Sequence, residues 1–195
     1  TQALSGGRAG SLLAVIDTTV TAGGARLLER RLSAPSRFLE TISDRLNAVS
    51  HVLENTQITK DVREKLRQVP DLDRALARLS LDRGGPRDLT AIRNGLAEAG
   101  LIASNGLGDA PKLLSSALQS LTGHDDLIEL LDQALIVEPP LLARDGGFIA
   151  PEYDEDLDEA RKLRDEGRSV IAQMQKEFAA QTGISTLKIK HNNVL

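Results

Sequence analysis

The amino-acid sequence predicts a mainly α-helical protein. Three observations lead to this fold class. Aromatic residues make up only 2% of the 195 residues, and leucine and alanine supply most of the apolar surface, which favours helix packing over a β-sandwich. Apolar residues recur every three or four positions over most of the chain. A hairpin signal occurs near residues 141–150, so we expect one small β-element among the helices.

The overall composition is that of an ordinary globular protein, with 41% hydrophobic and 27% charged residues. The 24 lysines and arginines are outnumbered by 28 aspartates and glutamates, so the chain is poorly suited to bind nucleic acid by itself. This balance still allows one end of the protein to contact DNA. The absence of cysteine excludes disulfide scaffolds and thiolate metal sites and suits a reducing cytosol. No membrane span or signal peptide is predicted. We therefore expect a cytoplasmic protein.

The first 70 residues are expected to form a series of helices. Ser11 can cap a short helix, a second covers about residues 22–33, and Ser36 is the expected cap of a longer helix that ends near Asn55. Apolar residues recur on one face of this longer helix: Leu39, Ile42, Leu46, Val49 and Leu53. A further helix then continues until Pro70, which stops it.

Residues 69–96, VPDLDRALARLSLDRGGPRDLTAIRNGL, are highly charged, and we interpret them as a helix–turn–helix joint. Gly84 and Gly85 end the first helix, and Pro86 suits the first turn of the second. The charges of the first helix can form pairs three or four residues apart, each worth only about 0.2 to 0.5 kcal/mol. The residues concerned are Asp71, Asp73, Arg74 and Arg78.

In the second half of the chain, two shorter helices are expected around residues 112–121 and 125–134. The helical spacing of apolar residues then ends. The stretch PPLLARDGGFIAPEY places two short apolar runs around residues 145–147, which predicts the hairpin. A helix of about 28 residues, roughly 42 Å long, is then expected from residue 154 to 181, with one narrow apolar seam. Gly183 suits its C-terminus, and LKIK after it alternates like a strand.

Motifs for catalysis or cofactor binding are missing from the sequence. There is no phosphate-binding loop of the form G-x-x-x-x-G-K-[ST] and no G-x-S-x-G nucleophile. The G-x-G at residues 106–108 follows a helix instead of a strand and is interpreted as a loop. We therefore expect no catalytic residue, no cofactor-binding residue and no enzymatic activity within this chain.

Two sets of residues imitate metal ligands. Asp154, Asp156 and Asp158 resemble the start of a calcium loop, but that loop needs glycine where Glu159 stands, so we favour a solvated acidic first turn of the long helix. The histidines lie far apart and lack metal-binding spacing, so surface or capping roles are favoured over metal ligation. They are His51, His124 and His191. No metal ligand is therefore expected.

One locally basic patch remains, formed by Lys188, Lys190 and His191 near the end of the chain. We favour the interpretation that these three residues are exposed side chains of a strand. The alternative is a contact with the DNA backbone through Lys188 and Lys190, since lysine neutralises phosphate charge.

Five segments, taken in order, resemble the MutS family of bacterial DNA mismatch-repair proteins. They are SLLAVIDTTVTAGGARLLERRLSAP, RLNAVSHVL, DLDRALARLSLDRGGPRDL, PPLLARDGGFIAPEYDEDLDEAR and TGISTLKIKHNNV, which together span nearly the whole chain. The resemblance implies a helical core or lever domain over residues 1–153, a long lever helix over 154–184 and the truncated start of a clamp domain, with its strand, over 185–195. None of the family's catalytic or base-reading residues falls on a position of this sequence.

The resemblance further implies that this is a piece of a longer protein, which binds mismatched double-stranded DNA as a homodimer and works with downstream repair proteins. ATP and Mg²⁺ are implied for an ATPase region outside the chain, and the lever region would couple mismatch binding to that region. Two other readings stay open: a helical interaction scaffold, and the lever region of a superfamily member outside mismatch repair. The sequence on either side would distinguish them.

Overall fold

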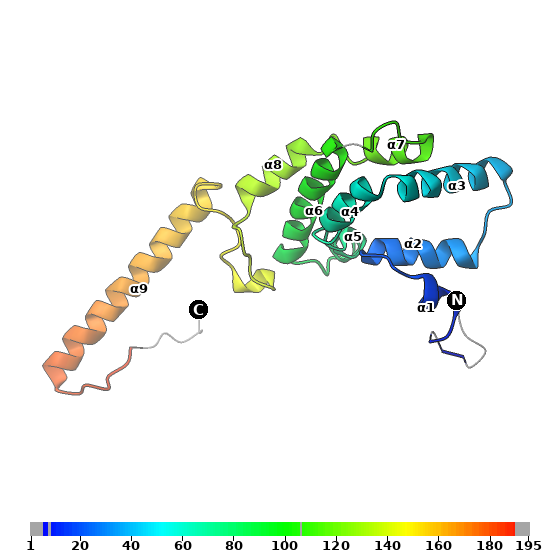
Figure 1. Cartoon of the computed structure of the whole chain (residues 1–195). Coiled ribbons are helices and arrows are strands. Elements are labelled where there is room, and N and C mark those ends of the chain that lie inside the picture. Colours follow the sequence, from blue (N-terminus) through cyan, green and yellow to red (C-terminus); the bar gives the residue numbers. More distant parts are fainter. Residues whose placement is uncertain (1–5, 8, 106, 190–195) are drawn as a thin grey trace. The chain divides into compact units, whose positions relative to one another are not determined.

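A computed structural model describes residues 6–7, 9–105 and 107–189, and over these residues the fold is mainly α-helical (Figure 1). The chain divides into two compact units, Thr1–Ile149 and Ala150–Leu195. The helices of the first unit are α1 Leu12–Ile16, α2 Ala22–Ser33, α3 Leu39–Glu54, α4 Thr56–Leu66, α5 Leu72–Ser80, α6 Pro86–Asn105, α7 Lys112–Gln119 and α8 Asp125–Ala134. The second unit contains α9, Glu155–Thr182. No helix in the described ranges is long and apolar enough to cross a membrane.

Short polar side chains begin several of these helices, and one of them, Ser11, is a cap that the sequence predicts. Ser11, Thr21 and Asp71 accept hydrogen bonds from the backbone N–H three residues later, at 3.2, 3.0 and 3.3 Å. The prediction that Ser36 caps α3 is wrong. Its hydroxyl accepts a hydrogen bond from the backbone N–H of Phe38 at 3.2 Å, a local turn, so α3 begins only at Leu39.

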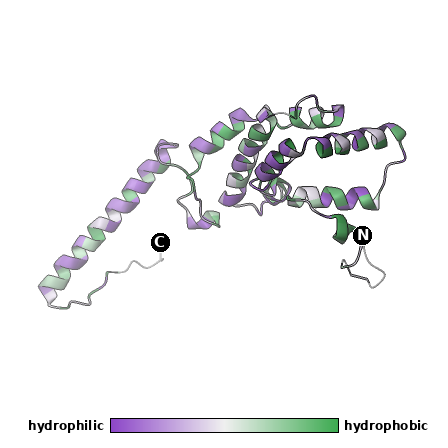
Figure 2. Ribbon diagram, viewed as in Figure 1, coloured by the Kyte–Doolittle hydropathy of each residue, from purple (hydrophilic) through white to green (hydrophobic). Residues whose placement is uncertain are grey.

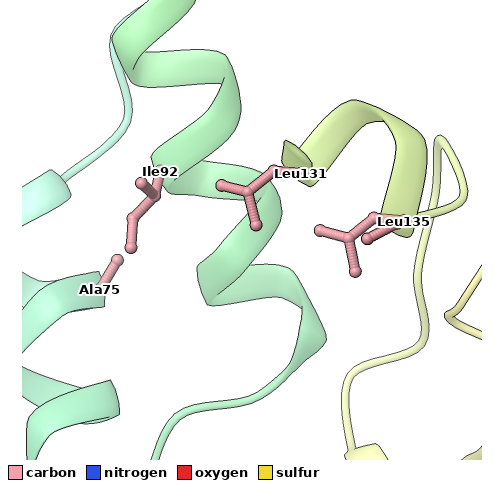
Figure 3. Packing of buried hydrophobic residues seen from close by; sticks show 5 residues of the cluster. Ala75, Ile92, Leu131 and Leu135 are labelled. Atoms are coloured by element: carbon pink, nitrogen blue, oxygen red, sulfur yellow. The ribbon is translucent and has the colours of Figure 1, made fainter. Parts of the chain in front are cut away.

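The core of the first unit is built around α6, which packs against α4, α5, α7 and α8. Five buried apolar residues meet there, and Figure 3 shows how four of them lie around α6. They are Ala75 of α5, Ile92 of α6, Leu131 and Ala134 of α8, and Leu135 just after α8. Gly95 of α6 is buried and faces Leu72 of α5, so these two helices approach closely. The charged joint of the sequence is therefore also the centre of the packing.

The predicted hairpin near residues 141–150 is replaced by a different arrangement. Residues Ala143–Asp145 form a short 3₁₀ helix, and the β-interaction is a single antiparallel bridge between Leu135 and Ile149. The backbone N–H of Ile136 donates to the carbonyl of Phe148 at 3.0 Å. The apolar run before the turn starts with two prolines, which have no N–H to give to a ladder. The β-element therefore joins the end of α8 to residues 148–149.

The second unit is dominated by α9, which matches the predicted long helix. Asp154 caps it by accepting a hydrogen bond from the backbone N–H of Leu157 at 2.8 Å, and Gly183 ends it with a left-handed φ of 71°. No residue of α9 is buried, and its apolar and polar residues alternate along the helix in Figure 2. The predicted clamp strand is not seen in residues 184–189, and residues 190–195 lie outside the described part of the chain.

Candidate functional site

The turn between α5 and α6 is held by one buried carboxylate. Asp88 is only 8% exposed. One of its oxygens accepts the backbone N–H of Gly85 at 3.0 Å, and the other accepts two N–H groups of the Arg78 guanidinium, from Nε at 2.9 Å and from Nη2. The hydrogen bond from Arg78 lowers the pKa of Asp88 below its ordinary value, although burial acts in the opposite direction. The Arg78–Asp88 pair therefore ties the end of α5 to the start of α6.

A second ion pair ties α2 to the start of α5. Arg26 donates to both oxygens of Asp71, at 2.9 and 2.7 Å, and to Asp73 at 2.9 Å. This fork geometry is the strong arrangement for a guanidinium and a carboxylate. The hydrogen bond from Arg26 lowers the pKa of Asp71 to about 2. Because Asp71 is also the N-cap of α5, one side chain fixes both the start of that helix and its position against α2.

Further contacts connect α6 to the elements around it. Arg93 is buried, and its Nη1 lies 3.5 Å from Asp132 of α8. Arg87 Nε donates to the carbonyl of Pro139 at 3.2 Å, and a Cβ at Gly85 would lie 2.8 Å from the carbonyl oxygen of Leu141. The joint is thus attached both to α8 and to the segment that follows α8. Arg87 and Arg93 therefore take part in contacts that hold the helices together.

The residues that imitate metal ligands take structural roles where they are described. His51 Nε2 lies 2.9 Å from the carbonyl oxygen of Leu107, and Asp158 accepts the backbone N–H of Glu152 and pairs with Arg161 at 2.8 Å. Asp154, Asp156 and Asp158 form the cap and the acidic first turn of α9, as the sequence predicts. Within the described ranges, no group of three or more His, Asp or Glu residues is placed to hold a metal ion. His124 lies just before α8, and His191 is outside these ranges.

Of the two lysines expected at a DNA contact, one can be placed. Lys188 follows α9 and is exposed, whereas Lys190 lies outside the described residues. The neighbouring Ile189 backbone N–H donates to the side chain of Gln175 at 3.0 Å, so the segment before Lys190 folds back along α9. Lys188 is therefore accessible to a phosphate.

The comparison with known proteins assigns the chain to a family. The family model described as MutS domain III matches residues 1–188. The chain belongs to the MutS domain III family. It is 64% identical, over its whole length, to proteins named DNA mismatch repair protein MutS from Paracoccus denitrificans, Cereibacter sphaeroides and Roseobacter denitrificans. The chain spans 22% of the length of each of these relatives.

Two links of this domain III were not predicted from the sequence. The charges of residues 71–78 were expected to pair within their own helix, and Asp71 does lie 3.4 Å from Arg74. However, the shorter contacts of Asp71 and Arg78 are with Arg26 and Asp88. The position of Asp71 directly before an apolar helix marks it as a cap, but no local pattern indicates a partner 45 residues away.

Proposed function

We propose that this chain is the helical core and lever region of a bacterial, cytoplasmic DNA mismatch repair protein, and that it couples the binding of mismatched DNA to a distant ATPase region. The whole-chain identity of 64% to proteins named DNA mismatch repair protein MutS carries the proposal. The coupling role is supported by the shape of α9, whose 28 residues extend about 42 Å. The catalytic groups, ATP and Mg²⁺ belong to other parts of the whole-length protein, which acts as a homodimer with downstream repair proteins.

The mechanism requires that α9 behaves as a stiff rod and that the helices of the first unit hold together firmly. An uninterrupted helix transmits a rotation along its axis, and packed interfaces at its ends can switch between two arrangements. In the first unit, the Arg26–Asp71 and Arg78–Asp88 pairs oppose loosening of α5 and α6. DNA would be contacted by the segment that follows α9, through Lys188 and Lys190, since lysine neutralises phosphate charge.

The test compares Val170→Pro with Val170→Ala in the whole-length protein. Val170 lies in the middle of α9 and is 56% exposed, so the alanine variant loses little packing, whereas proline breaks the helix at a cost of about 3 kcal/mol or more. We expect both variants to hydrolyse ATP at the basal rate and to bind mismatched DNA. Only Val170→Pro should lose the response of the ATPase to mismatched DNA. If the proline variant keeps the full response, α9 is not the coupling element.

A further inference from the structure

An apolar groove of about 400 Å³ lies between α3 and α7. Four apolar residues of α3, from Ala48 to Leu53, form one wall, and three apolar residues of α7 form the other. The remaining lining residues are two arginines, Arg31 of α2 and Arg45 of α3. No carboxylate lines the groove in the part of the chain that the structure describes.

The groove continues along α3 as an exposed apolar stripe. The five residues that the sequence places on one face of this helix are all exposed, and Phe38 just before the helix is 76% exposed. They are Leu39, Ile42, Leu46, Val49 and Leu53. From Phe38 to Leu53 the stripe is about 22 Å long at the usual helical rise. Most helical stability comes from packing of such a face, so this length of exposed leucine, valine and phenylalanine is expected to be covered.

The position of Arg45 indicates the chemistry of whatever covers the stripe. At about 100° per residue, Ile42, Val49 and Val52 lie within about 60° of Arg45 around the helix axis. The acidic residues of α3, Glu40, Asp44 and Glu54, lie about 100° or more away. Leu46 and Leu39 of the stripe are also about 100° and 120° away, so Arg45 lies at the edge of the stripe, where the stripe adjoins the groove. An arginine between an apolar stripe and an apolar groove needs a carboxylate once both are covered, because an unpaired buried charge is costly.

Neither Arg31 nor Arg45 has an ion pair with a described carboxylate. Arg31 is exposed, but partial desolvation and the neighbouring charges of Arg45 and Arg30 lower its pKa, so the two groove arginines repel each other. An anionic group between them would relieve this repulsion. Nucleic acid fits the site poorly, because the other seven lining residues are apolar and would desolvate phosphates without pairing them.

We propose that this groove and the adjoining stripe of α3 form the docking site of an acidic amphipathic helix that belongs to the whole-length protein outside this chain. Its apolar side fills the groove, and its carboxylates pair with Arg31 and Arg45. The proposal rests on the proposed function in one respect, that the chain works as part of a longer protein. The relatives leave room for such a helix, since the chain spans 22% of their length.

Hydrogen exchange of residues 39–54 tests the docking site in the absence of DNA and nucleotide. We expect exchange at least tenfold slower in the whole-length protein than in the 195-residue chain. Arg45→Glu in the whole-length protein should return the exchange of α3 to the rate seen in the chain. Arg37→Glu is the matched control, since Arg37 precedes α3, is exposed and does not line the groove. This control should leave the protection unchanged.

Folding of the variant is checked in the short chain, where Arg45→Glu should not lower the melting temperature, because Arg45 has no ion pair to lose there and its repulsion with Arg31 is removed. The proposal would be overturned if residues 39–54 exchange equally fast in both proteins, or if their protection in the whole-length protein survives Arg45→Glu. It would also be overturned if protection of these residues in the short chain rises with its concentration, which would indicate that a second copy covers the stripe. A full ATPase response to mismatched DNA in Val170→Pro, with α3 still protected, would refute the proposed function and leave the docking site standing.

Discussion

Gly95→Ala tests whether the close approach of α5 and α6 holds the first unit together. A Cβ at residue 95 would lie 2.4 Å from Cδ2, 3.0 Å from Cγ and 3.2 Å from Cδ1 of Leu72. Leu72 packs against the core cluster, so it cannot move aside freely. Gly100 lies in the same helix, and a Cβ there would meet nothing within 4 Å. The two substitutions therefore differ in packing but share the same gain in helix propensity.

The magnitudes follow from these two effects. Replacing glycine by alanine inside a helix stabilises it by about 0.8 to 1 kcal/mol, so Gly100→Ala should raise the free energy of unfolding by about that amount. Overpacking a filled core costs about 1 to 3 kcal/mol, so Gly95→Ala should change the free energy by between about 0 and −2 kcal/mol. The difference between the variants is then about 1 to 3 kcal/mol, because the propensity gain cancels.

Thermal or urea unfolding of the 195-residue chain, followed by circular dichroism, measures this difference. For a domain of this size, it corresponds to melting temperatures about 2 to 12 °C apart, with Gly100→Ala the higher. Equal stabilisation by both substitutions would refute the reasoning, since it would mean that α5 and α6 have room for a methyl group between them.

Four further predictions concern electrostatics, binding and dynamics. The lowered pKa of Asp71 means that its pair with Arg26 stabilises the fold fully above about pH 4 and loses this effect as the pH falls through about 2. Asp71→Asn should therefore cost about 1 to 2 kcal/mol at pH 7, and the cost should shrink steadily as the pH is lowered from about 4 to about 2 in urea titrations. Calorimetric titration of the chain with Mg-ATP should show no heat of binding; micromolar affinity would reveal a site that lacks any known motif. Mobility shifts at physiological salt should show weak DNA binding without preference for a mismatch, and a clear preference would contradict this. Amide exchange should be slowest in α5 and α6 and fast along α9, whose residues are all at least partly exposed; equal protection would mean that α9 is packed in solution.

Much of the helical fold could be predicted because its signals are local. Apolar spacing placed α2 and the long helix α9 within a residue or two of their observed bounds, and Gly84, Gly85 and Pro86 marked the turn between α5 and α6. Caps such as Ser11 act over three residues, so they can be predicted from the sequence. The hairpin prediction was wrong because the first apolar run begins with two prolines, which cannot donate the backbone hydrogen bonds of a β-ladder.

The sequence could not show which apolar helix faces are buried within the chain and which stay exposed. The spacing of Leu39, Ile42 and Leu46 is the same as that of a core helix, yet the structure leaves this stripe exposed and buries Ala48 instead. Periodicity reports that a face is apolar, not what covers it. The pairing of Arg26 with Asp71 was hidden for a related reason, since it depends on where two distant helices meet.

The central position of α6 has a consequence for the order of folding. Its neighbours α4, α5, α7 and α8 are close to it in sequence, so these contacts close short loops with a small loss of chain entropy. Arg78 and Asp88 are 10 residues apart, whereas Arg26 and Asp71 are 45 apart. We therefore expect α5 and α6 to form the folding nucleus and α2 to join after the rate-limiting step. Substitution of Asp88 should then slow refolding, while substitution of Arg26 should mainly accelerate unfolding.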